Sequence, residues 1–519
     1  MFGISSKPSR DKTWFVAQPM GDLPYDIGDM CNGGQQSYHE EVSDLVHKTS
    51  LSISHDLEQS KIFSEVSNFI SADKLKLHLE FAVANEIRPV FIAKYIADWH
   101  NNQLTTQNYP IYWDDHKGLG ELLAKYWAND DPVLILGRRA NIYRLIKRTL
   151  KPLHNKLLYL QWKMRCLFSI PTRRRREYFI PEGPNILVKY ILGINEVGRS
   201  DLFWLDSDIC SHPNHIVYFD QRAHIPKRKK DISYLAQVLD SMNITYVNLF
   251  RQNLPVNNCL TIPRSWKSGP LASRFKSLRL GANTDSEKWL INSLKELLID
   301  VDYWVSVYDQ LNVKIHVDIS VGTSDHIAQN IALDITNGIR IAWQRSEFLP
   351  NFGGYLGWYP CHVFLSWNAR ANLPLNQNKS RVGSIIIIGI SDENLLAHRV
   401  QLTSAWYADN HLDQFFTIAL FDNMFFRDDL FSKSMIVKLY VEFLQWVIQD
   451  DQVAVVNKPK RRLILERLPE LKELMYKAES TGRWINLIEK GSNLHSIDYL
   501  PIDAGIRACL LYTSDAADE

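Results

Sequence analysis

The chain has 519 residues, of which 45% are hydrophobic and 23% charged, and its formal net charge is +1. These fractions exclude fibrous and largely disordered chains, and a net charge near zero gives no general attraction for nucleic acid. No apolar run approaches the roughly 20 residues of a membrane-spanning helix, and residues 1–14 lack the apolar segment of a signal peptide. We therefore expect a cytoplasmic protein of two or three domains.

The N-terminal third is predicted to be mainly helical. Residues 1–50 are rich in Gly, Pro, Ser and Asp and show little periodicity, which favours loops. From Leu57 to Trp127, apolar residues recur at helical spacing. Residues 1–180 are therefore predicted as one helical and irregular region.

Within that region, residues 138–176 form a basic amphipathic segment, with many Lys and Arg residues and no Asp or Glu. Leucines between Leu145 and Leu160 supply its apolar face. Such a helix can pack in a core with a solvated basic face, or lie on an anionic membrane surface. The first interpretation is favoured, and peripheral contact with the inner face of the cell membrane stays open.

From residue 185, short β-rich runs alternate with helices, which predicts βαβ units and a parallel sheet. The strands are predicted at His215–Phe219, Ile244–Leu249, Val313–Ile319, Gly338–Trp343 and His362–Trp367. Helices are predicted at Ser286–Leu311 and Asp325–Ile335. These elements define a first Rossmann-like domain over residues 185–370.

A second alternating block predicts another Rossmann-like domain over residues 380–508. Its strands are predicted at Gly383–Ile390, Phe416–Phe421, Val453–Val456 and Trp484–Ile488, and its helices at Lys433–Gln449 and Leu468–Ser480. The fold class is therefore α/β, with two Rossmann-like domains behind a helical region. The second domain has too little chain for a complete open sheet, so we expect it to be truncated.

The last segment, residues 509–519, reads CLLYTSDAADE. That string is the translation of a widely used transposon adapter in one reading frame, and the match runs over the whole segment. We therefore expect the genuine sequence to stop near Ala508, and residues 509–519 to be an adapter artefact that takes no part in the fold.

Open α/β sheets bind ligands beyond the carboxyl ends of their strands, so residues that follow strands are the candidates. Lys458, Lys460 and Arg461 follow the strand Val453–Val456 and are predicted to bind the phosphates of a donor. A solvated basic loop is the alternative. Asp422 follows the preceding strand and is a candidate to accept a hydrogen bond from a sugar or ribose hydroxyl, or to cap the turn.

In the first sheet, Asp220 and His224 follow the strand His215–Phe219 and are the candidate catalytic residues. His224 is a possible general base for an acceptor hydroxyl, although a surface histidine in a polar loop is the commoner case. Asp318 and the turn before Asp325 are explained by a helix N-cap. An anion at that helix N-terminus is the alternative.

Metal binding is considered for residues 206–215. The candidate ligands are Asp206 and Asp208 for a divalent cation, and Cys210, His212 and His215 for zinc. Neither set is joined by a second cluster at a recognisable spacing, and His215 opens a predicted strand. No metal and no cofactor are therefore expected, beyond a nucleotide-sugar substrate.

Three features of the second block occur in a characteristic order: a strand ending in Phe421-Asp422, an aromatic-rich helix over Leu439–Val447, and a strand ending in Lys458–Arg461. This order resembles the surface polysaccharide biosynthesis proteins named for a C-terminal Pro-Phe-Thr-Ser (PFTS) motif. It is more distantly similar to other two-Rossmann glycosyltransferases of the GT-B type. The resemblance covers residues 416–508, and the naming motif would be expected just beyond Ala508.

The resemblance implies metal-independent glycosyl transfer from a nucleotide sugar in surface or capsular polysaccharide biosynthesis. The second domain would hold the donor, and the first a glycan or lipid-linked glycan acceptor. Some capsule transferases have a His-Pro pair where this chain has Lys460 and Arg461, so no histidine role carries over. Two other classes stay open: a sugar-nucleotide epimerase or hydrolase of the same architecture, and a non-catalytic assembly protein of the polysaccharide machinery.

Overall fold

The computed structural model divides into two compact units. Among the described residues, the first unit holds those up to residue 389 except Gln35 and Gln36, and the second holds these two and the residues from 393 onward. The structure describes residues 3–4, 15–16, 35–104, 111–114, 118–127, 133–136, 180–181, 183–190, 214–219, 233, 235–237, 239–240, 244–249, 260–262, 269–319, 324–344, 360–369, 382–389, 393–421, 433–459, 468–487, 504–505, 507–508 and 510–513.

The N-terminal region is helical, but its first long helix begins earlier than we expected. The helices are α2 (Gln35–Glu58), α3 (Lys61–Ser67), α4 (Ala72–Leu104) and α5 (Gly120–Tyr126). The prediction of loops to residue 50 is wrong, because Val42, Val46, Ile53 and Leu57 share one helix face and are all buried.

A small sheet in the same region was not predicted. Its strands are β1 (Gly3–Ile4), β2 (Phe15–Val16), β3 (Ile111–Asp114) and β4 (Val133–Leu136), in the order β1-β2-β3-β4. Each strand has four residues or fewer, too short for a period-2 pattern to stand out from the sequence around it.

The larger sheet of the first unit has eight strands, and every pair in it is parallel. Its spatial order is β12-β11-β10-β9-β5-β6-β7-β8. The strands are β5 (Asn185–Lys189), β6 (His215–Phe219), β7 (Thr245–Asn248), β8 (Leu260–Thr261), β9 (Val313–Ile319), β10 (Ile339–Trp343), β11 (Val363–Ser366) and β12 (Ser384–Ile387). From β5, the next strands in sequence (β6, β7 and β8) follow toward one edge of the sheet. From β9, the next strands (β10, β11 and β12) follow toward the opposite edge, so the strand order reverses between β5 and β9.

The last strand corrects one prediction. We expected Gly383–Ile390 to be a buried strand opening the second sheet. Instead β12 pairs with β11 at the edge of the first sheet, and Ile386, Ile387 and Ile388 are 48%, 53% and 40% exposed. An apolar run predicts a strand, but it does not say which sheet accepts it or how fully it is covered.

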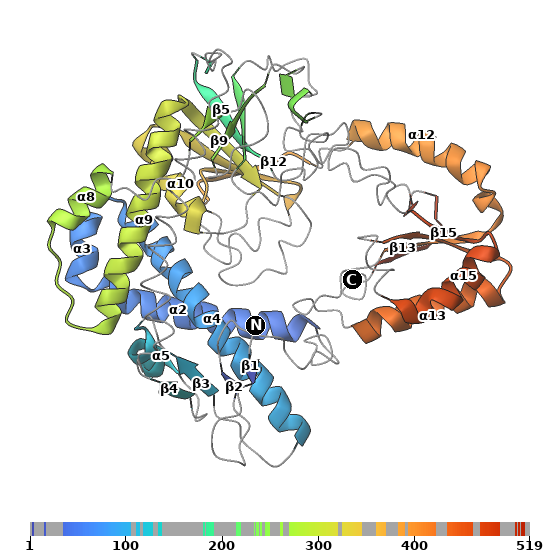
Figure 1. The fold of residues 1–519 in the computed structure, drawn as a ribbon, viewed down its shortest axis with the longest axis horizontal. Helices are drawn as coiled ribbons and strands as arrows, with labels where there is room; N and C mark the ends of the chain where they lie inside the picture. The colour runs from blue at the N-terminus through green and yellow to red at the C-terminus, as the bar shows by residue number, and fades with distance from the viewer. Residues whose placement is uncertain are drawn as a thin grey trace, which may run out of the picture. The chain divides into compact units, whose positions relative to one another are not determined.

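Helices α9 (Asp285–Gln310) and α10 (Ser324–Ile335) pack against each other beside the first sheet (Figure 1). The start of α9 is fixed by a capping box, in which the Thr284 hydroxyl accepts from the Glu287 backbone N–H. The Glu287 carboxylate accepts in return from the Thr284 N–H at 3.3 Å. Helix α8 (Pro270–Ser277) precedes α9. Two backbone N–H groups in the first turn of α8 donate to the carboxylate of Asp302 on α9.

The N-terminal helices belong to the same unit because they cover this pair. Lys74 of α4 bonds to the Asp334 carboxylate and to the Asn330 side chain, both on α10. His78 of α4 lies within hydrogen-bonding distance of Ser293 on α9, at 2.9 Å. Helix α4 therefore packs on both α9 and α10.

The second unit contains a four-stranded parallel sheet in the order β15-β14-β13-β16. Its strands are β13 (Phe416–Phe421), β14 (Val453–Lys458), β15 (Trp484–Asn486) and β16 (Leu510–Thr513). Here too the order reverses, between β13 and β16. The predicted fold class is confirmed: an α/β protein with two Rossmann-like sheets and a helical N-terminal region.

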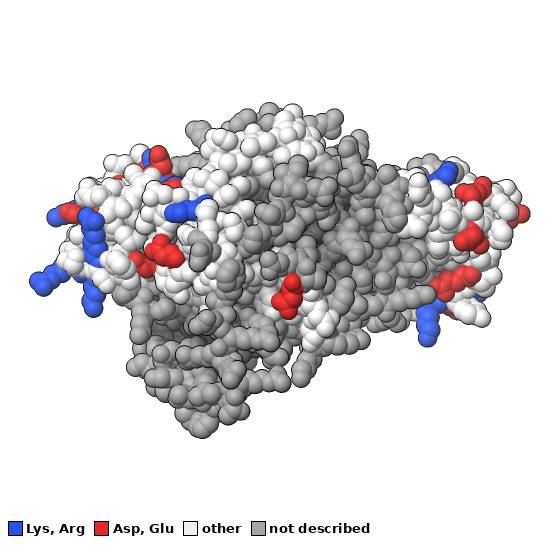
Figure 2. Space-filling model, turned by 90° about the horizontal axis from the view of Figure 1, so that it is seen from above, with Lys and Arg blue, Asp and Glu red and all other residues white. Residues whose placement is uncertain are grey.

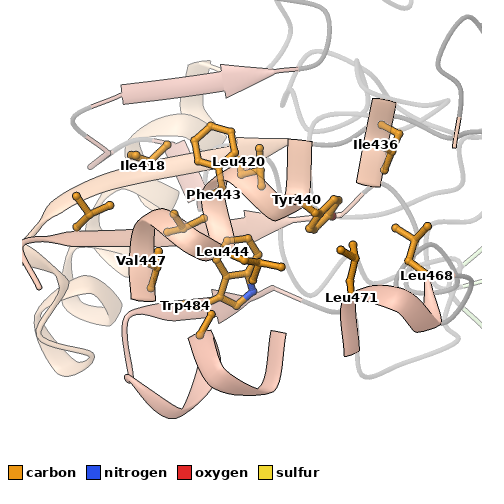
Figure 3. Close-up of a cluster of buried hydrophobic side chains, with 13 residues drawn as sticks. Ile418, Leu420, Ile436, Tyr440, Phe443, Leu444, Val447, Leu468, Leu471 and Trp484 are labelled. Atoms are coloured by element: carbon orange, nitrogen blue, oxygen red, sulfur yellow. The ribbon is translucent and has the colours of Figure 1, made fainter. Parts of the chain in front are cut away.

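Both faces of this second sheet are covered. On one face, α13 (Lys433–Gln449), η6 (Pro469–Leu471) and α15 (Lys472–Ser480) bury an aromatic cluster that includes Tyr440, Phe443 and Trp484 (Figure 3). The other face carries α12 (Glu393–Asp409) and η5 (Leu412–Gln414), with Tyr407 and Leu412 in its core. Strand β14, buried from Val453 to Asn457, therefore has a nearly continuous apolar sequence.

The expectation that nothing beyond Ala508 takes part in the fold does not match the structure. Leu510–Thr513 forms β16, which pairs in parallel with β13, with Ile418 opposite Leu510. A short apolar segment can occupy an open sheet edge whatever its genetic origin, because the edge offers unpaired backbone groups. That residues 509–519 derive from an adapter stays a prediction.

No described helix combines the length and the apolar character that a membrane crossing requires. On the face shown in Figure 2, the Lys and Arg side chains of the described residues lie among Asp and Glu side chains. The basic segment at residues 138–176 lies outside the described residues.

Candidate functional site

The second sheet places Lys458 at its carboxyl edge. Lys458 is the last residue of β14, stands in register with Phe421 at the end of β13, and is partly buried. It continues the row of Ala454 and Val456, both of which face the α12 side of the sheet. The predicted strand ended at Val456, whereas β14 runs two residues further and ends at Lys458. That Lys458 binds the phosphates of a donor stays a prediction.

The neighbouring residue, Asn457, anchors the strand that carries Lys458. Its side chain is fully buried and donates to Asn486 Oδ1 at 2.8 Å, while its backbone carbonyl accepts from Leu487. Asn486 in turn accepts from the Trp484 indole N–H and donates to Glu479. Because a buried amide without partners is costly, these bonds hold the ends of β14 and β15 together.

The first sheet gathers charged groups where its strand order reverses. Lys189 ends β5, and Asp318 is the next-to-last residue of β9, its neighbour. Val188 is in register with Val317, so the two following residues, Lys189 and Asp318, lie side by side on the same face. This face is the one that α9 and α10 cover, because His316, two residues before Asp318, contacts Tyr308 of α9.

Asp318 is fully buried between two basic groups. Arg340 of β10, also fully buried, donates from Nη2 to Oδ1 of Asp318 and from Nη1 to the Pro360 carbonyl at 2.7 Å. The other carboxylate oxygen, Oδ2, lies 3.2 Å from Nε2 of His326, in the first turn of α10. Burial by itself would raise the pKa of Asp318, but Arg340 and then His326 hold it well below its usual range. Asp318 is therefore ionised.

The ionised carboxylate determines the state of His326. Burial lowers the pKa of this histidine below its usual 6.5, and Asp318 opposes that effect only in part, so the ring is neutral at pH 7. Among the described residues, Oδ2 of Asp318 makes no hydrogen bond at this distance. The buried Nδ1 of His326 has no hydrogen-bonding partner there either, and the same is true of Nδ1 of His78.

Two other histidines of this unit have both ring nitrogens occupied. His316 contacts the hydroxyls of Tyr308 and Tyr218 at 2.8 and 3.0 Å, and burial lowers its pKa to about 3. His362, before β11, accepts from the Arg340 backbone N–H at 2.8 Å and lies 2.8 Å from Asp334. These rings connect structural elements and offer no vacant lone pair.

Most of the predicted site residues lie outside the described residues: Asp220, His224, Asp422, Lys460 and Arg461. The same holds for Asp206, Asp208, Cys210 and His212, whereas His215 is buried at the start of β6. Among the described residues, no group of three or more His, Cys, Asp or Glu side chains could hold a metal ion.

The sequence interpretation missed Lys189, His326 and Arg340, and explained Asp318 as part of a helix cap. One signal was available. The strand Val313–Ile319 alternates apolar residues with His316 and Asp318, and Arg340 lies inside the apolar run IRIAW. A charged residue in a run that reads as a buried strand requires a buried partner of opposite charge.

No family model matches the chain, and no curated protein matches it. The chain is similar to the S. aureus MnaA–UDP co-structure at 13% identity, with 54% of this chain and 69% of that one covered and a TM-score of 0.27. It is also similar to a putative UDP-N-acetylglucosamine 2-epimerase from Listeria monocytogenes at 11% identity, with 64% and 74% covered and a TM-score of 0.34.

Proposed function

We propose that this protein is a glycosyltransferase-type enzyme that transfers a sugar from a nucleotide donor during surface-polysaccharide biosynthesis. The observation that carries the proposal is the position of Lys458, the last residue of β14 at the carboxyl edge of a parallel sheet. Open α/β sheets bind their ligands beyond the carboxyl ends of the strands. Lys460 and Arg461 follow directly in the sequence and add positive charge for a diphosphate.

The fold supports the division of labour that the sequence resemblance implies. The second sheet would bind the nucleotide sugar, with Asp422 near the ribose or sugar, and the first sheet would bind the glycan acceptor. Cations beside the diphosphate would stabilise the leaving group without a metal ion. The assignment to polysaccharide biosynthesis rests on the resemblance of residues 416–508 alone.

The proposal is tested by replacing two cations together, Lys458→Ala with Arg461→Ala. Binding of UDP, GDP and dTDP sugars is measured by calorimetry on the whole chain. Hydrogen bonds to charged groups contribute about 1.5–3 kcal/mol each, so affinity for the donor that binds should fall more than about tenfold. The matched control is Lys472→Ala with Lys477→Ala, which removes two exposed cations from α15 in the same unit.

Three results would contradict the proposal. Unchanged affinity in the folded double variant would show that the loop is only a solvated basic turn. Binding of no nucleotide sugar by the unaltered protein would favour the non-catalytic assembly protein. Conversion of a bound nucleotide sugar into its epimer, or its hydrolysis with no acceptor used, would favour the epimerase or hydrolase class.

A further inference from the structure

We propose that strand β12 is the interface through which two copies of this chain pair edge to edge, as antiparallel strands about a two-fold axis at Ile386. The inference goes beyond the proposed function and does not depend on it. It concerns only the first sheet, of which β12 forms one edge. A second copy is the partner that the backbone, the side chains and the flanking charges of this edge fit.

The backbone of β12 is paired on one side. The N–H groups of Ser384 and Ile388 donate at 2.8 Å to carbonyls in and next to β11. Because successive peptide groups of a strand point in opposite directions, the N–H and C=O groups of Ile385 and Ile387 point away from β11. Among the described residues, no strand pairs with that side. A row of unpaired backbone groups at a sheet edge is a template for another strand.

The side chains of this edge are apolar and in contact with solvent. Ile386, Ile387 and Ile388 are each at least 40% exposed. Because successive side chains of a strand point to opposite faces, apolar surface is uncovered on both faces of β12. Edge strands that stay unpaired are commonly protected by Lys or Pro, and residues 382–390 contain neither. A partner strand would cover this surface.

The charges that flank the run favour a second copy in the antiparallel orientation. In the sequence, Arg381 precedes the uncharged residues 382–391, and Asp392 and Glu393 follow them. Antiparallel pairing of two copies brings the cationic start of each run toward the acidic end of the other. Parallel pairing would bring like charges together, which is unfavourable.

The register of the pair follows from the direction of the backbone groups. Ile385 of one copy exchanges both hydrogen bonds with Ile387 of the second copy, and the reverse, because these two residues carry the outward groups. Ile386 then faces Ile386 of the second copy on the axis, in a pair without hydrogen bonds and with about 4.5 Å between the Cα atoms. Both copies use the same patch, so the pair is closed and does not grow.

The opposite edge of the sheet fits a partner less well. It is formed by β8, which has only two residues, Leu260 and Thr261. A contact between β12 of one copy and β8 of the next would be head to tail and would build open-ended assemblies. Pairing of two short strands covers less than the roughly 1,200 Å² of a stable interface, so we expect a reversible dimer that dissociates in the micromolar range.

The test is sedimentation velocity of the whole chain at concentrations of about 1–100 μM, where a weak dimer forms. Ile386→Lys and Ile386→Glu should each weaken the dimer more than about tenfold, because each places two like charges opposite each other on the axis. An equal mixture of the two variants should dimerise again, because opposite charges then face each other. The matched control, Ile335→Lys, alters an isoleucine of α10 that is 46% exposed and should leave association unchanged.

Amide hydrogen exchange in the unaltered protein needs no variant, so it decides the case if a variant does not fold. As the protein concentration rises, exchange at Ile385 and Ile387 should slow, because their N–H groups become hydrogen-bonded in the dimer. Exchange at Ser384 and Ile388 should change less, because their N–H groups already donate on the β11 side.

A monomer at every concentration would overturn the inference, since the edge then has no partner strand from a second copy. A dimer that persists unchanged in both Ile386 variants would place the interface elsewhere and overturn it as well. The same holds for open-ended assemblies in place of a dimer, and for a mixture that associates no better than the single variants, because neither is compatible with a closed antiparallel pair.

Discussion

At the residue scale, the first unit contains several fully buried ionisable side chains whose protonation the fold determines. The pair of Asp318 and Arg340 is stable because each charge has the other within a hydrogen bond. Removing one partner of such a pair usually costs about 3–5 kcal/mol, since the other charge stays buried and uncompensated. The attraction within such a buried pair is largely offset by the cost of removing both charges from water, so the pair adds little net stability.

His78 gives a prediction at this scale. It is buried between α4 and α9, and burial lowers its pKa from 6.5 to about 4. Between those values the unfolded chain binds more protons than the folded one, so acidification favours unfolding. The free energy of unfolding should lose about 3 kcal/mol from this group as pH falls from 6.5 to 4, at about 1.4 kcal/mol per pKa unit.

The measurement is denaturant unfolding between pH 7 and pH 4.5 for the unaltered protein and for His78→Gln. An amide keeps a polar contact for Ser293 and does not titrate in this range. The variant should therefore lose less stability on acidification, while His316, with its pKa of about 3, contributes equally to both proteins. Identical pH dependence in the two proteins would contradict the prediction.

At the element scale, local signals fix the ends of helices and the pattern of burial along strands. Helix α9 shows this best, because Thr284 caps its first turn and the buried residues from Trp289 to Tyr308 follow a helical period. The cap is local chemistry that the sequence T-D-S-E already contains. Packing against α10 and the sheet then stabilises a helix that would be marginal in isolation.

The cap can be tested by Thr284→Ala. The substitution removes the acceptor for the Glu287 N–H, and the free energy of unfolding should fall by about 1 kcal/mol. Ser277→Ala on α8 is the control, because its exposed hydroxyl only donates to the carbonyl of Arg274; such a surface change should stay within about 0.5 kcal/mol. Equal effects of the two substitutions would show that the capping box adds nothing to stability.

At the scale of the whole molecule, the balanced net charge hides a strongly uneven distribution along the chain. Residues 138–176 carry an excess of Lys and Arg within a protein of net charge +1. Each such residue near an anionic bilayer surface adds about 1 kcal/mol of attraction, and the effect decays within a Debye length. An enzyme acting on a lipid-linked glycan would gain from this contact.

Sedimentation with vesicles tests that contact. If the segment binds membranes, the protein should sediment with phosphatidylglycerol vesicles at low salt and should be released as salt rises. Replacing Arg173–Arg176 by Gln should weaken the binding, whereas vesicles of phosphatidylcholine alone should bind little. Equal sedimentation with both lipids, or none with either, would favour a helix packed in the protein core.

The sequence by itself determined many of the strands and helices of both sheets, but it did not predict β5, β8, β16 or α12. Val313–Ile319, Phe416–Phe421 and Lys433–Gln449 were predicted with the bounds that the structure has. Such elements are readable because apolar periodicity, caps and β-branched runs act over a few neighbouring residues. The same local signals placed Lys458 at the end of a buried strand, where the structure has it. Its role in binding a donor stays a prediction.

Only the tertiary structure decided which elements are neighbours. It assigned β12 to the edge of the first sheet, placed β5 next to β9, and brought Arg340 and His326 onto Asp318. Asp318 lies on β9, Arg340 on β10 and His326 at the start of α10. The spacing of apolar residues predicts which face of each element is buried, but it does not predict which other element covers that face. Parallel pairing joins strands distant in sequence, so the contacts of Asp318 with Arg340 and His326 could not be predicted before the strand order was known.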